Sequence, residues 1–456
     1  MHRFGGIRLK INNNGIWFFL LGLGAQTQVH FFGSIGISEL VVFLIAPWIL
    51  VLDYASLKRD GFHIFVHIGI LTCIGCVISG ITNHTHPLLF LKGLALPYGI
   101  LSAVVVFHRL FRKDRVNLKW YFVGSFLSGI VSIFIFQPET FTVREGAVAT
   151  GSEAIEAVTS YSLFWSEKIG SLIRLPVCGW YLQTPLSYSL FAILGLAVFT
   201  IISSNASGRA AALVAVISFA FIAFGGKSRK RIQAIGKHFG VVCISFVILL
   251  VVFKLSYQYA AENGYLGVKA RDKYEKQTAM GKSALRLLIA GRTEFFASLR
   301  ACLDKPIIGF GPRPIDSKGY YREFLKEYGN PDDYDQYVRW EFENARRGFT
   351  IGELMRTHSH ITSFWAYYGI MGLIFWLYVL WLLYKYVKVF ACAYPRWYGY
   401  LAMSVASMMW SIFFNPLSSR IGEGLMISSI LMVRAIYMNS IILNPMEIAE
   451  IEKYNK

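Results

Sequence analysis

Apolar residues occur along the chain in long runs that are separated by short polar and basic segments. A helix needs about 17 to 25 apolar residues to cross a bilayer, and several runs reach or approach that length. None of them shows the strict alternation of polar and apolar positions that marks a half-buried strand. The pattern therefore predicts an all-α integral membrane protein with about 11–12 transmembrane helices. The candidate spans lie near Gly15 to Gly33, Ile35 to Leu52, Phe62 to Gly80, Leu88 to Phe107, Trp120 to Phe136, Leu186 to Ser203, Ala210 to Phe224, Phe239 to Phe253, Ile361 to Tyr384, Tyr398 to Phe414 and Leu425 to Leu443.

The composition agrees with this interpretation. Of the 456 residues, 55% are hydrophobic and only 16% are charged, whereas an ordinary soluble domain has roughly 25% charged residues. The formal net charge is +18. On a membrane protein a basic excess collects in cytoplasmic loops, which anionic lipids attract. Cytoplasmic loops account for the positive charge, so the charge does not indicate nucleic-acid binding, and we exclude that function.

The short loops predict the orientation, because Lys and Arg are retained on the cytoplasmic side. The turns between the basic segments contain only one Lys or Arg residue, Arg420. These turns are His30 to Gly33, Asn83 to Pro87 and Pro416 to Glu423. We therefore expect both ends of the chain on the cytoplasmic side. The basic segments are Arg3 to Lys10, Lys58 to Arg59, Arg109 to Lys119, Lys227 to Lys237 and Lys385 to Arg396.

One crossing is missing from this topology. The segment Gln137 to Thr184 should begin outside, yet the next span must begin inside if Lys227 to Lys237 is cytoplasmic. We expect a weak, partly polar or re-entrant helix around Ser160 to Leu182, where apolar residues keep helical spacing. The alternative is that the following half is inverted, which would put five basic residues outside.

The segment from about Ser256 to Thr357 is the one soluble-like part of the chain, and we expect it outside the membrane as a small, mainly helical cap. Lys269 to Arg286 and Tyr320 to Arg347 have the alternating charge of exposed helices, and Lys305 to Pro314 has the Gly and Pro content of a turn. The predicted organisation is an N-terminal membrane bundle (1–255), a large external loop (256–357), and C-terminal spans with a short tail (358–456).

Three groups of motifs lie on the face that this topology puts outside. Each motif alone is ordinary, since arginines at membrane edges interact with head groups and Gly-x-Gly is common in turns. Their order along the chain is not ordinary. They are Ser207-Gly208-Arg209 at the start of a span, Gly291-Arg292 followed by Pro306-Ile307-Ile308-Gly309-Phe310-Gly311 in the loop, and His358-Ser359-His360, with His358 eleven residues before the start of Gly369-Ile370-Met371-Gly372.

In these motifs the last two-thirds of the chain resembles the O-antigen ligase and O-antigen polymerase superfamily. The resemblance rests on Arg209, Arg292, the P-x-x-G-x-G turn, and the His358 to Gly369 spacing. The sequence departs from the family pattern at Tyr367, where an acidic residue is often found, and shows a phenylalanine pair, Phe295 and Phe296, after the G-R motif. The resemblance implies a GT-C-like membrane enzyme in the bacterial inner membrane with its active site facing the periplasm.

The resemblance also implies the chemistry. The family transfers a glycan from an undecaprenyl-pyrophosphate carrier, whose departing charge guanidinium groups can stabilise through paired hydrogen bonds. We therefore expect Arg292 and Arg209 to be catalytic, in a metal-independent reaction without a cofactor. His358 is the expected base or acceptor-orienting group. The expected substrate-binding residues are Arg313, Arg420, His360, Gly309 and Gly311.

The expected partners are the lipid-linked glycan donor, membrane lipids, and an acceptor that is either lipid A core or a second lipid-linked glycan. The first acceptor describes a ligase and the second a polymerase, and the single large loop followed by few spans favours the ligase. A flippase or transporter of such lipids is the rival class. A transporter should show charges within its spans and a repeat between its halves. The intramembrane charges here are few, chiefly Lys92, Lys254 and Arg434.

The topology is directly testable. Reporter fusions at Asn330 and Arg231 should score on opposite sides of the membrane, outside and inside respectively, because charge bias retains the basic loop in the cytoplasm. The reverse pattern would contradict the catalytic assignment of the large loop.

Overall fold

The computed structural model describes residues 13–25, 28–30, 34–113, 118–131, 255, 258–260, 262–263, 265, 293–328, 334–335, 337–338, 355–386, 398–415 and 420–442. Several predicted elements lie outside these residues. They are the spans expected at Leu186 to Ser203, Ala210 to Phe224 and Phe239 to Phe253, the weak helix at Ser160 to Leu182, and the loop helix at Lys269 to Arg286.

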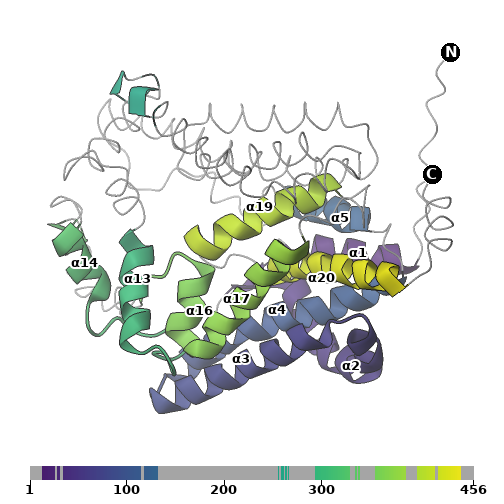
Figure 1. The fold of residues 1–456 in the computed structure, drawn as a ribbon, viewed down its shortest axis with the longest axis horizontal. Coiled ribbons are helices and arrows are strands. Elements are labelled where there is room, and N and C mark those ends of the chain that lie inside the picture. The colour runs from purple at the N-terminus through teal and green to yellow at the C-terminus, as the bar shows by residue number, and fades with distance from the viewer. Residues whose placement is uncertain are drawn as a thin grey trace.

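The described part is almost entirely helical (Figure 1). Its N-terminal helices are α1 (Asn13–Leu23), α2 (Ile37–Arg59), α3 (His63–Thr82), α4 (Pro87–Lys113) and α5 (Leu118–Val131), and a short antiparallel hairpin, β1 (Gln28–His30) and β2 (Ser34–Gly36), lies between α1 and α2. The later helices are α13 (Thr293–Asp304), α14 (Tyr320–Tyr328), α16 (His360–Tyr368), α17 (Ile370–Tyr386), α19 (Tyr398–Phe414) and α20 (Arg420–Ile442).

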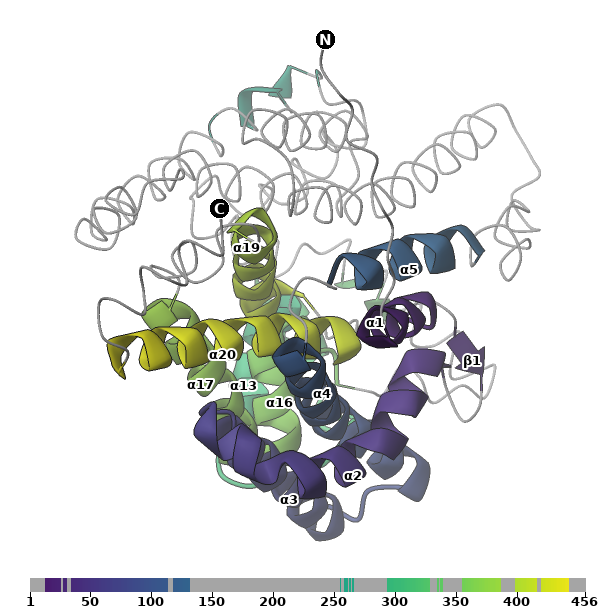
Figure 2. The ribbon, with the colours of Figure 1, turned by 90° about the vertical axis from the view of Figure 1, so that its right-hand side faces the viewer.

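Helix α4 lies at the centre of the described bundle (Figure 2). It packs against α2, α3 and α20, so the N-terminal helices and the C-terminal helix share one core. Gly424 of α20 lies directly on α4, where an added Cβ would overlap the Cβ of Ala103. Small residues at helix contacts let backbones approach closely, which is how helices associate in a bilayer.

Three of the described helices are long and apolar enough to cross a membrane by length and composition, at Ile37–Arg59, His63–Thr82 and Pro87–Arg112. The chain is therefore a helical membrane protein in this region, as the hydrophobic pattern predicts. Large side chains on the outer face of α2 are exposed, including Leu44, Trp48 and Val51. A hydrophobic helix face turned away from the protein core suits a lipid environment.

The first predicted span is wrong in its extent. The structure ends α1 at Leu23, and a hairpin within residues 28–36 replaces the continuation of the helix. Ser38 donates its hydroxyl to the carbonyl of Leu21 at 2.6 Å, which satisfies a helix-terminal carbonyl from outside the helix. Helix α1 packs closely on α5, since a Cβ on Gly22 would overlap the carbonyl oxygen of Tyr121.

The span predicted from Ile361 to Tyr384 is two helices. Helices α16 and α17 meet at Gly369, whose φ of 65° an L side chain rarely adopts. The break is fixed by a segment distant in the sequence, because the carbonyl of Ile307, which follows α13, accepts a hydrogen bond from the Ile370 amide at 3.0 Å. A hydrophobicity pattern does not register a break caused by a distant segment.

The C-terminal helix α20 begins before the predicted Leu425, at Arg420. The Arg420 side chain pairs with Glu39 near the start of α2, and the Arg420 amide donates to the same carboxylate at 3.3 Å. Glu39 also accepts a hydrogen bond from the amide of Gly36 at 3.2 Å. One carboxylate therefore satisfies the first turns of both helices at the predicted outer face.

At the opposite end of the bundle, charged groups are paired in a similar way. Arg109 of α4 contacts Asp53 of α2 at 2.9 Å. Arg434, one of the charges expected within a span, donates to the carbonyl of Gly61 at 2.8 Å and to the Tyr378 hydroxyl at 3.3 Å. A cation at this depth is thus held by polar groups of the protein.

Candidate functional site

The predicted turn at 305–314 follows α13 and lies against the break between α16 and α17. The amide of Phe310 donates to the carbonyl of Ala366 at 2.7 Å, and the Ile370 amide donates to Ile307 in return. The indole nitrogen of Trp365 adds a hydrogen bond to the carbonyl of Pro306 at 3.0 Å. Two motifs that are separated along the sequence are therefore one structural unit.

Glycine is required where this turn meets α16. Gly309 has a φ of 78°, and a Cβ there would lie 2.7 Å from both the carbonyl oxygen of Ala366 and the amide of Gly369. Gly311 has a φ of 95°, and its Cβ would overlap the Thr85 hydroxyl. Both glycines of the P-x-x-G-x-G motif thus serve close packing, and the expected contact of Gly309 and Gly311 with substrate stays a prediction.

The same turn also rests on the outer ends of α3 and α4. The Asn83 side chain donates to the carbonyl of Gly309 at 3.2 Å and accepts from the Lys305 ammonium at 3.0 Å. A Cβ on Gly93 would overlap the Pro312 ring, so the turn touches α4 there. The turn at 305–314 consequently contacts the N-terminal and the C-terminal helices at once.

Helix α13 lies against α16 through one face. Its buried residues, Thr293, Ala297, Ser298, Ala301 and Cys302, follow helical spacing. The Ser298 hydroxyl donates to the Thr362 hydroxyl at 2.8 Å. Burial raises the pKa of the Cys302 thiol to about 12, so this cysteine is a neutral packing residue.

His358 is exposed at the surface immediately before α16, between two residues whose side chains are bonded to that helix. On one side, the Thr357 hydroxyl accepts from Ser363 at 2.7 Å. On the other, Ser359 is the N-cap of α16 and accepts from the Thr362 amide at 3.0 Å. The imidazole is therefore accessible, while the backbone that carries it is held.

His360, two residues further, has a different environment. Its side chain is 0% exposed and lies 3.6 Å from a carboxylate oxygen of Glu423 on α20. Its ring packs on that of Trp376 with centroids 4.8 Å apart. His360 is therefore enclosed by Glu423 and Trp376, and its expected role in substrate binding stays a prediction.

The arginines of the prediction have different positions. Arg209 and Arg292 lie outside the described residues, although Thr293, which follows Arg292, is buried at the start of α13. Arg313 is half-buried directly after the glycine turn and has a φ of 50°. Arg420 is engaged by Glu39 as described above, and its role in substrate binding stays a prediction.

Beyond the turn, α14 packs against α13. Asp316 accepts hydrogen bonds from the amides of Tyr320 and Tyr321, at 2.9 and 3.2 Å, and so caps α14. Asp304 at the end of α13 accepts from the Tyr320 hydroxyl at 2.5 Å and from Lys318 at 3.0 Å. These hydrogen bonds hold the pKa of Asp304 below its ordinary value.

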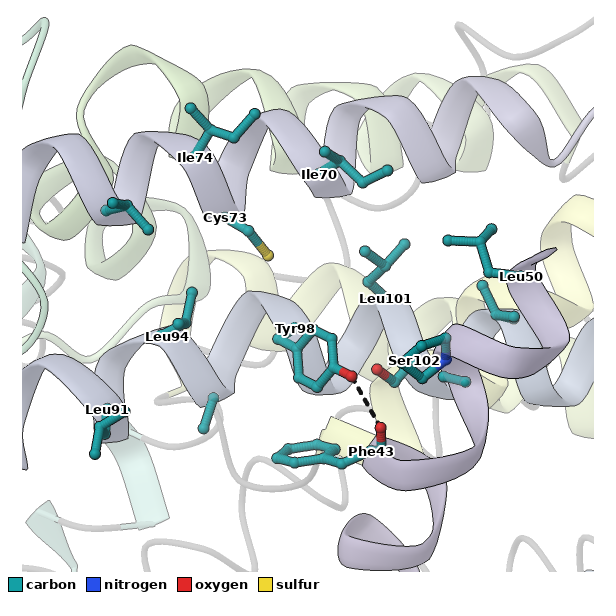
Figure 3. A pocket seen from close by; sticks show the side chains of 15 residues that line it. Phe43, Leu50, Ile70, Cys73, Ile74, Leu91, Leu94, Tyr98, Leu101 and Ser102 are labelled. Carbon is teal, nitrogen blue, oxygen red and sulfur yellow. Dashed lines mark hydrogen bonds between the residues drawn. The ribbon is translucent and has the colours of Figure 1, made fainter. Parts of the chain in front are cut away.

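An apolar groove of about 670 Å³ opens between α2, α3 and α4 (Figure 3). Its lining includes Leu91 and Leu94 of α4, whereas Gly93, which contacts Pro312, is not among the lining residues. The Tyr98 hydroxyl donates a hydrogen bond to the carbonyl of Phe43 at 2.8 Å. The groove therefore follows one face of α4, between α2 and α3.

Within the described part of the chain, no group of three or more His, Cys, Asp or Glu side chains is arranged to hold a metal ion. The sequence reasoning missed three residues of this site, Glu39, Asn83 and Glu423. Two carboxylates in otherwise apolar outer segments were the available signal, because an ionisable residue at a span end needs a partner.

The glycine turn gives a stability prediction. Gly309→Ala should lower the thermal unfolding midpoint, because the left-handed backbone costs about 1–2 kcal/mol with a Cβ and the new methyl overlaps the carbonyl of Ala366. Gly319→Ala is the matched control. Gly319 has a φ of 65° but faces only the flexible Arg322 side chain, so the unfolding midpoint of this variant should fall less than that of Gly309→Ala. Equal midpoints for the two variants would contradict the packing role of Gly309.

Residues 191–377 match the family model described as O-antigen ligase. The matched region contains Arg209, Arg292, the glycine turn and His358, and it ends within α17. The resemblance of the motifs to this superfamily is thereby confirmed. No curated protein matches the chain.

Proposed function

Because residues 191–377 carry a domain of the O-antigen ligase family, we propose that the protein transfers a glycan from an undecaprenyl-pyrophosphate-linked donor to a sugar hydroxyl. The reaction takes place at the periplasmic face of the bacterial inner membrane, on a multi-pass protein. The family match, the apolar helices and the accessible histidine support this proposal together.

The observation that carries the proposal is the position of His358. An exposed imidazole on a backbone held at both neighbours lies beside a turn that ends in a cation, Arg313. Tyr367, whose hydroxyl contacts Thr357 at 3.2 Å, also interacts electrostatically with Arg313 and so connects the two positions. An imidazole and a guanidinium on segments that Tyr367 connects suit a reaction that removes a proton and releases an anion.

In the proposed reaction, an acceptor hydroxyl attacks the anomeric carbon of the donor glycan while its proton passes to His358. The bond between that carbon and the pyrophosphate oxygen breaks, and the carrier leaves as the pyrophosphate anion. Arg209, Arg292 and Arg313 stabilise the departing charge through hydrogen bonds that match phosphate geometry. These cations take the part that a divalent metal plays in other pyrophosphate-releasing enzymes, so we propose a metal-independent transferase.

The groove between α2, α3 and α4 supports a place for the donor's lipid tail. Its lining is almost wholly apolar, which suits a prenyl chain. Helix α4, which forms one wall of the groove, also meets the turn through Gly93, which contacts Pro312, the residue before Arg313. We therefore place the lipid tail in this groove.

The acceptor divides the proposal into two versions. A ligase uses lipid A core, and a polymerase uses a second lipid-linked repeat unit. We favour the ligase because one large external loop is followed by only a few spans in the sequence. Deleting the gene distinguishes them, since loss of a ligase leaves lipid-linked polymer accumulating, whereas loss of a polymerase reduces the surface glycan to one repeat.

The protein reconstituted in proteoliposomes tests the enzyme class. With a lipid-linked glycan donor and a sugar acceptor, we expect formation of a new glycosidic bond and release of the lipid pyrophosphate. Translocation of the donor without bond formation would instead identify a transporter, and it would refute the proposal.

Arg292 gives a test of the mechanism. Arg292→Ala should abolish transfer while the folded fraction stays unchanged, because a loop arginine that binds pyrophosphate contributes little to packing. Arg292→Lys should retain intermediate activity, since lysine keeps the charge but loses the paired donors. Transfer rates and the amount of folded membrane protein are measured together, and a fully active alanine variant would remove Arg292 from the site.

His358→Ala should lower the transfer rate by roughly 10²- to 10⁴-fold, as expected for the loss of a general base, with donor affinity little changed. It should also lose more activity than His360→Ala.

Chelators should leave wild-type activity intact, because arginines neutralise the leaving group. Inactivation by EDTA with recovery in Mg²⁺ or Mn²⁺ would instead require a metal at the site.

A further inference from the structure

We propose that the buried pair of His360 and Glu423 is a positioning pair that fixes His358 for the transfer reaction. The inference rests on the proposed function, because it concerns how the base of that reaction is held. His360 and Glu423 themselves do not touch substrate. They act through the segment that carries His358, the residue directly before the N-cap of α16.

The pair joins two helices that are distant in the sequence. His360 is the first residue of α16, and Glu423 lies in the first turn of α20. Their side chains are 0% and 5% exposed, with the imidazole Nε2 3.6 Å from the carboxylate. Removing two ionisable groups from water is costly unless they interact with each other, so the contact favours one relative position of the two helix ends.

The imidazole is also held from its flat side. Trp376 of α17, which is fully buried, lies 4.8 Å from the His360 ring centroid, and Phe364 packs on Trp376 at 5.4 Å. The His360 ring is therefore restricted both by a carboxylate and by an aromatic surface. A side chain restricted in this way fixes the backbone at the start of α16.

His358 lies on the part of the backbone that this arrangement fixes. Thr357 and Ser359, its direct neighbours, are bonded to Ser363 and Thr362 in the first turns of α16. These contacts hold His358 relative to α16, and the His360–Glu423 pair holds α16 relative to α20. The contacts of Thr357 and Ser359 are local. The His360–Glu423 pair determines where the His358 imidazole lies relative to the rest of the bundle.

The first turn of α20 also carries an ion pair. Arg420, one turn before Glu423 on α20, binds Glu39 of α2. Among the described residues, the ionisable groups that these contacts bring to the first turn of α20 are thus Glu39, Arg420, Glu423 and His360. Together they connect α2, α20 and α16 at the predicted outer face.

A positioning role has a kinetic signature. Displacing a catalytic group by about 1 Å can lower a rate on the order of 100-fold without removing any contact with the substrate. Loss of the pair should therefore lower kcat for transfer while the donor KM changes little. Loss of a group that binds the pyrophosphate would raise the donor KM instead.

The experiment compares variants of the full chain in proteoliposomes. His360→Gln and Glu423→Gln keep the approximate size of each side chain but remove its ionisable group, and the double variant completes a thermodynamic cycle. Lys318→Met is the matched control, because it removes an exposed ion pair, with Asp304, elsewhere in the external loop. Each variant is measured for kcat and donor KM per folded molecule, and for its thermal unfolding midpoint.

We expect both single variants to lose about 10- to 100-fold in kcat with a donor KM close to that of the wild type. The double variant should lose little more than either single variant, in kcat and in unfolding midpoint, because both changes break one interaction. Lys318→Met should retain the wild-type kcat. In addition, the exchanged pair, His360→Glu with Glu423→His, should recover part of the kcat that the single variants lose.

Wild-type kcat per folded molecule in Glu423→Gln, or additive losses in the double variant, would overturn the inference. A lower folded fraction with an unchanged kcat per folded molecule would also overturn the inference, since the pair would then serve stability alone. These outcomes leave the proposed function intact. A wild-type chain that forms no glycosidic bond refutes the proposed function first, and the stability cycle then still decides whether the two residues interact.

Discussion

The described structure depends on backbone hydrogen bonds between the turn at 305–314 and the helix break at Gly369. Ile307 and Phe310 of the turn are hydrogen-bonded to Ile370 and Ala366, which lie on either side of that break. Buried amides and carbonyls at such a junction need partners, and here each segment supplies them for the other. The turn and the helix break are consequently one interaction, and His358 is held by α16, the helix that this interaction terminates.

The outer ends of the described helices are joined by carboxylates as well as by packing. Glu39 satisfies the first turns of α2 and α20, and Glu423 contacts His360 at the start of α16. Buried acidic groups with partners restrict the arrangements that a bundle can adopt, since a shifted helix leaves a buried polar group without its partner. The segment that carries His358 is therefore supported by helices from distant parts of the chain.

Much of the described fold follows from the hydrophobic pattern, and the failures have a common cause. The pattern predicts α3, α4 and α19 closely, because their apolar runs coincide with helices. It misses the end of α1 and the break at Gly369, where Ser38 and Ile307 bind the helix backbone from outside. The order of motifs indicated that the glycine turn and His358 belong together, but no spacing rule reveals that His360 is buried against Glu423. Long-range contacts of single side chains are not encoded in local periodicity.

The contact between Asn83 and the carbonyl of Gly309 also sets an order of assembly. These residues are 226 positions apart, and at 5 to 20 residues per second the ribosome needs roughly 10 to 45 s to make the chain between them. The Ser79 hydroxyl donates to the carbonyl of Tyr367 at 2.9 Å, and the ribosome makes this partner later still. During that interval the outer end of α3 has polar groups whose final partners have not been synthesised. The nascent N-terminal bundle must therefore keep this end hydrated, at the membrane surface or within the insertion machinery, until the turn at 305–314 has been made and covers it.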